Sequence, residues 1–116
     1  MLIVDDHASF RRHARRLLES EGFTVVGEAA DGASAVAAAR SLRPELVLLD
    51  VLLPDTDGFA VAELLADEPA APVVVLISSR EAEDFGPRLG RSAARGFLHK
   101  GELSGAALAA LAGNAP

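Results

Sequence analysis

The chain has 116 residues, 50% of them hydrophobic, and a formal net charge of −6. This length and composition suit one domain with its own core, and the lack of cysteine excludes disulfides and thiolate metal sites. The acidic balance argues against direct nucleic-acid binding, which needs a basic face, and no apolar run reaches the roughly 18 residues that span a bilayer. Because no signal peptide is recognisable at the N-terminus, we expect a cytoplasmic protein without a membrane segment.

Short apolar runs alternate along the chain with longer segments that suit helices. The runs cover residues 2–4, 23–26, 46–49, 73–77 and 97–98, and the helical segments cover residues 8–20, 33–42, 58–67, 81–94 and 103–112. Short runs of this kind, several of them rich in valine and isoleucine, are typical of strands buried on both faces. Strand and helix alternate five times, which predicts an α/β fold: a doubly wound five-stranded parallel sheet with helices on both faces.

The first helical segment divides its side chains between two faces. An apolar face would pack on the sheet and a basic face would meet water; the first contains Phe10, Ala14, Leu17 and Leu18, and the second contains Arg11, Arg12, Arg15 and Arg16. Gly22 and the Arg43-Pro44 pair are expected to end the first and second helices. Gly86, Pro87 and Gly90 interrupt the fourth segment, so we expect a short, bent or partly unfolded helix there.

Polar side chains follow several of the predicted strands at their carboxyl ends. These residues are Asp5, Asp6, Asp50, Ser78, Ser79 and Lys100. In an open doubly wound sheet, ligands bind at this edge, where the strand order reverses. For the order 2-1-3-4-5, the reversal falls between the first and third strands, beside Asp50.

Taken singly, each of these polar residues has an ordinary explanation as a turn, cap or surface residue. Together they predict a site, and Lys100 is notable because it is the only lysine beside ten arginines. Three adjacent carboxylates need a counterion, and a hard divalent cation such as Mg²⁺ prefers oxygen ligands. A carboxylate nucleophile beside such a metal suits attack on phosphorus, with Lys100 and a serine hydroxyl holding the phosphoryl oxygens.

Four motifs resemble those of the receiver domains of two-component response regulators. They lie at residues 2–7, 48–59, 75–79 and 96–100, and the second is the most specific: Asp50 is followed by Pro54 and then by Asp57-Gly58. The resemblance covers residues 2 to about 111. It implies a flavodoxin-like sheet of order 2-1-3-4-5, in a receiver domain of the kind that usually precedes a helix-turn-helix DNA-binding domain.

The resemblance also implies roles for individual residues. Asp50 would accept a phosphoryl group from a sensor histidine kinase. Mg²⁺ would be held by Asp5, Asp6, Asp50 and the backbone carbonyl of Leu52. Ser78 and Lys100 would bind the phosphoryl oxygens, and Ser78 and Phe97 would act as the switch pair. The output face would be formed by helix 4, strand 5 and helix 5. The resemblance thus implies a phosphorylation-dependent switch rather than an enzyme.

Some features leave alternatives open. Gly101 stands where most receivers have proline after the lysine, and helix 4 is interrupted. Both features favour a phosphorylation-independent interaction or dimerisation module on the same fold. An aspartyl phosphatase is disfavoured because Leu52 occupies the position of its second aspartate, and a nucleotide binder is disfavoured because no glycine-rich loop follows the first strand.

Two expectations concern partners and domain organisation. We expect residues 1–116 to form a single receiver domain without an effector domain, and a homodimer is one expected assembly. The arginine face of the first helix is most simply a solvated surface, and its alternative role is docking to the kinase.

Overall fold

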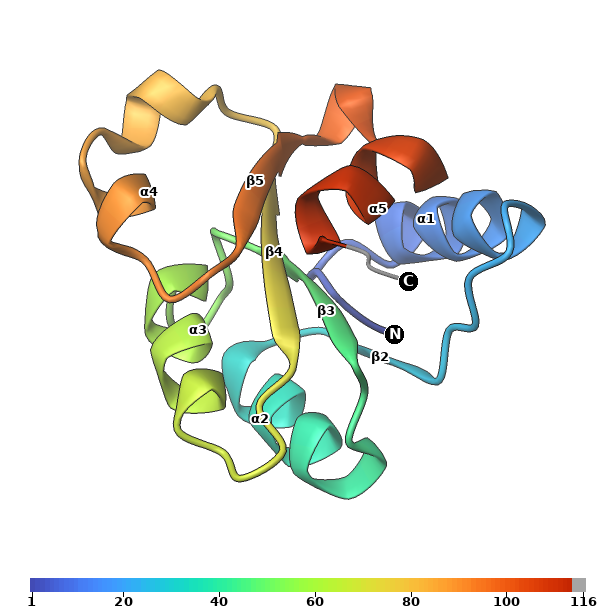
Figure 1. The fold of residues 1–116 in the computed structure, drawn as a ribbon, viewed down its shortest axis with the longest axis horizontal. Helices are drawn as coiled ribbons and strands as arrows, with labels where there is room; N and C mark the ends of the chain where they lie inside the picture. The colour runs from blue at the N-terminus through green and yellow to red at the C-terminus, as the bar shows by residue number, and fades with distance from the viewer. Residues whose placement is uncertain (114–116) are drawn as a thin grey trace.

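The computed structural model describes residues 1–113. Within them, one parallel sheet lies between two layers of helices (Figure 1), and its strand order β2-β1-β3-β4-β5 confirms the predicted topology. The strands are β1 (Leu2–Val4), β2 (Gly27–Ala29), β3 (Leu46–Asp50), β4 (Val73–Ser78) and β5 (Gly96–His99). The helices are α1 (Ala8–Ser20), α2 (Gly32–Leu42), α3 (Gly58–Ala66), α4 (Arg88–Arg91) and α5 (Gly105–Ala112), and the 3₁₀ turns are η1 (Ala82–Phe85) and η2 (Lys100–Glu102).

The central strands are apolar throughout because both of their faces are covered. In β3, Val47 and Leu49 point into the core beneath α2 and α3, whereas Leu48 points into the core beneath α1 and α5. All three side chains are fully buried. Successive side chains of a strand point to opposite faces, so a continuous apolar run is what a two-sided sheet requires.

The helices of each layer reach the sheet through small or branched side chains. On one face, Ala35 and Ala39 of α2 and Leu65 of α3 are buried against the strands. On the other, Leu18 of α1 and Leu108 of α5 are fully buried. Among the described residues, no helix is long and apolar enough to cross a membrane.

The predicted second strand at residues 23–26 is wrong, since β2 begins at Gly27. The Phe23 N–H donates to the carbonyl of Leu18 and so completes the end of α1. Val25 is buried in the core beneath α1 and α5, whereas Val26 is 46% exposed. Residues 23–26 therefore form a loop with apolar side chains. The pairing of β2 with β1 starts only at Leu2 and Gly27.

The predicted ends and interruptions of helices are confirmed. Gly22 follows α1 with a φ of +99°, a conformation that favours glycine, and Arg43 adopts the left-handed conformation at the end of α2. Residues 81–94 form only the 3₁₀ turn η1 and the single turn α4, with Gly86 at a φ of +60° between them.

The basic face of α1 meets water only in part. Arg11 Nε is 3.0 Å from Glu28 Oε1, and Arg15 Nη1 is 2.8 Å from Glu28 Oε2. These pairs join α1 to the edge strand β2, so the expectation that all four arginines face water is wrong for Arg11 and Arg15. Arg12 and Arg16 are exposed as predicted.

Candidate functional site

The carboxyl ends of the strands surround a pocket of about 230 Å³. Its lining comes from four strand ends and the loops after them: Asp6, His7, Asp50, Leu52, Leu53, Pro54, Ser78, Ser79 and Lys100. Asp5 lies beside them, fully buried. The structure thus brings together every polar residue that the sequence places at these strand ends.

Asp50 ends β3 and is buried, with 3% of the residue exposed. Its Oδ1 accepts a hydrogen bond from the Leu52 N–H at 3.1 Å, and its Oδ2 lies 3.4 Å from Lys100 Nζ. Burial, and to a smaller extent the nearby charge of Asp5, together raise the pKa of Asp50 to about 6, against the opposing effects of the Leu52 N–H and Lys100. The charged form of Asp50 is therefore less favourable in the folded protein than in water, and added positive charge would offset this cost.

Asp5 follows β1, and each of its two carboxylate oxygens contacts a different partner. Its Oδ1 accepts from the His7 N–H at 2.8 Å, and its Oδ2 lies 2.6 Å from Lys100 Nζ. Burial alone would raise the pKa of Asp5, but contacts with Lys100, the His7 N–H and Asp50 outweigh it, so the pKa is lowered. Of the two carboxylates, Asp5 is thus the one that ionises more readily.

Lys100 extends from the end of β5 to both carboxylates. Burial would lower the pKa of Lys100, but Asp5 and Asp50 outweigh this effect and raise it. Its Nζ also lies 4.5 Å from the ring centroid of Phe10, a cation–π contact. In the sequence, Phe10 marks only the apolar face of the first helix.

The carboxylates form a group that could hold a cation. Ligand atoms of Asp5, Asp6, His7 and Asp50 all lie within 4.8 Å of one another. The buried Oδ2 of Asp5 makes no aligned hydrogen bond, although Lys100 Nζ is close to it. An oxygen-rich set of carboxylates, two of them buried, fits Mg²⁺.

The loop after β3 depends on Gly58 for its path. A Cβ on Gly58 would lie 2.5 Å from the backbone oxygen of Asp50, so only glycine allows this approach. Asp57 caps α3 by accepting from the Ala60 N–H at 2.9 Å. Asp55 accepts from the Gly32 N–H at 2.8 Å, so this loop is also tied to the start of α2.

The two predicted switch residues, Ser78 and Phe97, lie in surroundings that differ from each other. Ser78 is buried, and its Oγ accepts from the Arg80 N–H at 3.0 Å. Phe97 is half-buried, and its ring centroid lies 5.8 Å from that of Phe85, which in turn lies 5.8 Å from that of Phe59. This row of three rings joins β5, η1 and α3. Phe85 could not be found from the sequence, because no periodicity marks a residue in an isolated turn.

Gly101 has a local role that proline could not fill. Its N–H donates to His99 Nδ1 at 2.9 Å, and proline has no N–H. His99 Nε2 lies 2.9 Å from the carbonyl oxygen of Ser79. A neutral ring with its proton on Nε2 satisfies both contacts, so His99 links the end of β5 to the loop after β4.

Comparison with known proteins agrees with this geometry. The family model described as the response regulator receiver domain matches residues 1–111. A two-component response regulator of the LuxR family from Aurantimonas sp. SI85-9A1 superposes with a TM-score of 0.84 at 30% identity, over 97% of this chain and 84% of that chain. The CheX-CheY-BeF3-Mg+2 complex from Borrelia burgdorferi gives a TM-score of 0.81 at 28% identity, over 95% of this chain and 83% of that chain.

The curated relatives are longer proteins. The response regulator GacA of Pseudomonas aeruginosa is 39% identical over 103 residues, which is 87% of this chain and 48% of that protein. The matched part of the chain spans 56% and 37% of the lengths of two further curated relatives. With a family model spanning nearly the whole described structure, the chain belongs to the response regulator receiver domain family and has a signalling role based on phosphorylation.

Proposed function

We propose that this domain is a phosphorylation-dependent switch in which Asp50 accepts a phosphoryl group from a sensor histidine kinase in the cytoplasm. One observation carries the proposal: the buried Asp50 carboxylate faces a pocket that also contains Lys100, 3.4 Å away. The Leu52 N–H holds Oδ1. This leaves Oδ2 as the oxygen without a backbone partner.

Phosphorylation forms a bond between an Asp50 oxygen and phosphorus and breaks the bond from phosphorus to the donor histidine nitrogen. Asp5, Asp6, Asp50 and the Leu52 carbonyl would hold Mg²⁺, which neutralises negative charge on the transferring group when it is bound. Lys100 Nζ, 3.4 Å from Asp50 Oδ2, would donate to phosphoryl oxygens. This transfer needs no further substrate, so we infer that the domain is not an enzyme acting on a separate molecule.

Ser78 and Phe97 would convert the modification into a change of surface. The Ser78 hydroxyl accepts a bond from the Arg80 N–H but keeps its own proton, which it can donate to a phosphoryl oxygen. Movement of this loop inward would open space beside Phe97, whose ring now contacts that of Phe85, and the Phe97 ring would rotate into this space. The result is a shift between two packings of η1, α4, β5 and α5, the proposed output face.

An interaction module that needs no phosphorylation is the second candidate. The division of residues 81–94 into η1 and the single turn α4 favours it, because this segment belongs to the proposed output face. In this alternative, the output face binds its partner equally well whether or not Asp50 is modified.

A single experiment distinguishes the phosphorylation-dependent switch from the phosphorylation-independent interaction module. The chain is incubated with Mg²⁺ and acetyl phosphate, or with a beryllofluoride salt, and followed by intact mass and amide NMR. Asp50→Asn is the test variant and Asp67→Asn, an exposed carboxylate beyond α3, is the matched control. We expect modification and shifts at residues 78–112 in the wild type and in Asp67→Asn, and neither in Asp50→Asn. A wild type that stays unmodified and unshifted would exclude the switch.

A further inference from the structure

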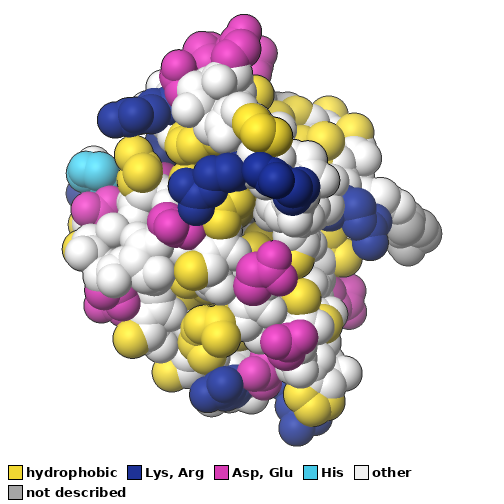
Figure 2. Space-filling model, turned by 90° about the vertical axis from the view of Figure 1, so that its left-hand side faces the viewer, with side chains coloured by type: hydrophobic (Ala, Val, Ile, Leu, Met, Phe, Trp, Pro, Cys, Tyr) yellow, Lys and Arg dark blue, Asp and Glu magenta, His cyan; other side chains and the backbone are white. Residues whose placement is uncertain are grey.

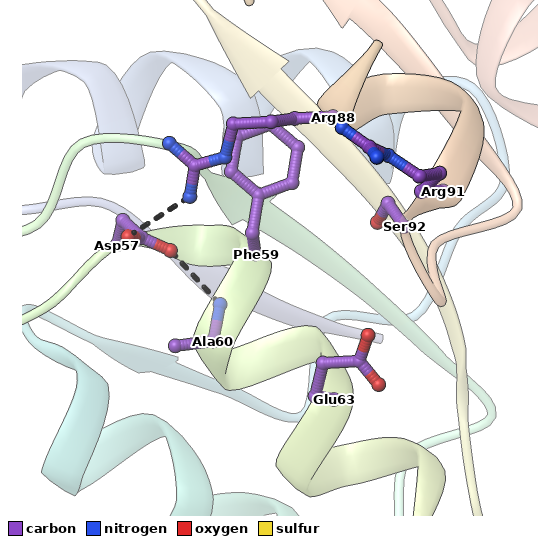
Figure 3. Close-up of a pocket in the computed structure, with 7 residues that line it drawn as sticks. All are labelled: Asp57, Phe59, Ala60, Glu63, Arg88, Arg91 and Ser92. Atoms are coloured by element: carbon purple, nitrogen blue, oxygen red, sulfur yellow. Dashed lines mark hydrogen bonds and ion pairs between the residues drawn. The ribbon is translucent and has the colours of Figure 1, made fainter.

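A second pocket lies on the face formed by α3 and the α4 turn. Its volume is about 300 Å³, and it shares no lining residue with the carboxylate pocket. The lining consists of Asp57, Phe59, Ala60, Glu63, Arg88, Arg91 and Ser92 (Figure 3). Figure 2 shows basic side chains lying across this face, with hydrophobic and acidic side chains beside them.

Arg88 fastens the α4 turn to α3. Its guanidinium carbon lies 4.3 Å from the ring centroid of Phe59, and its Nη2 lies 3.3 Å from Asp57 Oδ2. Stacking and ion pairing together restrict the guanidinium. Arg91 is three residues further on in the same turn, so its position relative to α3 is restricted as well.

Two opposite charges on this face have no counterpart in the chain itself. Within residues 1–113, neither Arg91 nor Glu63 forms an ion pair. Both line the pocket, together with the apolar groups of Phe59 and Ala60. The adjacent Leu64 is 52% exposed and extends the apolar surface of this face. The pocket thus combines apolar groups with an unpaired cation and an unpaired anion.

We propose that this α3–α4 face binds a second copy of the chain about a two-fold axis. Such a contact pairs the same patch with itself, so every interaction occurs twice. Arg91 of each copy would meet Glu63 of the other, and the exposed Leu64 side chains would be covered beside them. Charge complementarity selects this occupant, because a uniformly acidic or basic partner would be repelled by one of the two groups. The interface shares the α4 turn with the proposed output face but does not include β5 or α5.

Sedimentation velocity tests the proposal with the unmodified chain, from about 10 μM to about 1 mM, the range of weak association. The wild type is expected to form dimers within this range. Arg91→Glu and Glu63→Arg each place like charges opposite one another twice, so each should weaken dimerisation at least about tenfold. Arg12→Glu, an exposed change on α1 at the far side of the molecule (Figure 1), is the control and should leave dimerisation unchanged.

Mixing the two single variants gives the decisive result. In a mixed dimer, the introduced glutamate of one chain faces the introduced arginine of the other, and the native Arg91 faces the native Glu63. Heterodimers should therefore form at concentrations at which neither variant alone forms detectable homodimers. Far-UV circular dichroism and unchanged labelling by acetyl phosphate show that both variants fold. A monomeric wild type, a dimer indifferent to both changes, or a mixture without heterodimers would each overturn the proposal.

Discussion

Replacing Asp50 with asparagine should stabilise the metal-free domain at neutral pH. The pKa of Asp50 rises from 3.8 to about 6 on folding. Because the folded state then binds more protons than the unfolded chain between about pH 4 and pH 6, the free energy of unfolding falls as the pH rises through this window. At 1.36 kcal/mol for each unit of pKa, ionised Asp50 costs about 3 kcal/mol above pH 6.

Asparagine removes this cost and retains an oxygen for the Leu52 N–H, but loses the attraction to Lys100. We therefore expect the free energy of unfolding of Asp50→Asn to exceed that of the wild type by about 1–3 kcal/mol near pH 7.5. Near pH 5 the advantage should be about 1.4 kcal/mol smaller, since most of the wild-type Asp50 is then protonated in the folded state.

Urea denaturation with EDTA present, near pH 5 and near pH 7.5, measures both differences. Asp67→Asn serves as the control, because this exposed carboxylate should leave the stability and its pH dependence unchanged. The reasoning is refuted if Asp50→Asn is no more stable than the wild type near pH 7.5, or if its advantage does not depend on pH.

Two further changes test the packing around the site. Gly58→Ala should cost about 2 kcal/mol or more in urea denaturation, because its Cβ would lie 2.5 Å from the Asp50 carbonyl oxygen; a cost below the error of the measurement would contradict the close approach. Glu28→Gln should cost about 1 kcal/mol at low salt, since it weakens the ion pairs with Arg11 and Arg15. That loss should shrink at about 1 M NaCl, and a salt-independent loss would show that packing, rather than charge, joins α1 to β2.

The fold was predictable where one physical requirement set the pattern. Buried central strands need apolar side chains on both faces, so β3 and β4 stand out as runs. The edge strand β2 does not stand out as an apolar run, because a strand at the edge of the sheet, such as Gly27–Ala29, is not buried on all sides. The apolar run before β2 has the pattern of a strand, but it forms a loop whose Val25 side chain is buried in the core.

The candidate site was predictable to the extent that strand ends meet at one edge. Asp5, Asp50 and Lys100 could be placed together from topology alone, and the structure brings them within ion-pair distance. Contacts between side chains of separate elements could not be derived in this way. Phe10 beneath Lys100 and Arg88 on Phe59 depend on helix rotation and on the path of an irregular turn, which sequence periodicity does not determine.

The position of Lys100 between Asp5 and Asp50 has a consequence for ion selectivity. The pocket already contains a built-in monovalent cation, 2.6 Å from one carboxylate and 3.4 Å from the other. Sodium or potassium would bring only the same single charge as the ammonium that it would have to displace. A divalent ion adds charge that the lysine cannot provide, so the residue that we propose to bind phosphoryl oxygens would also make the pocket discriminate between cations by valence.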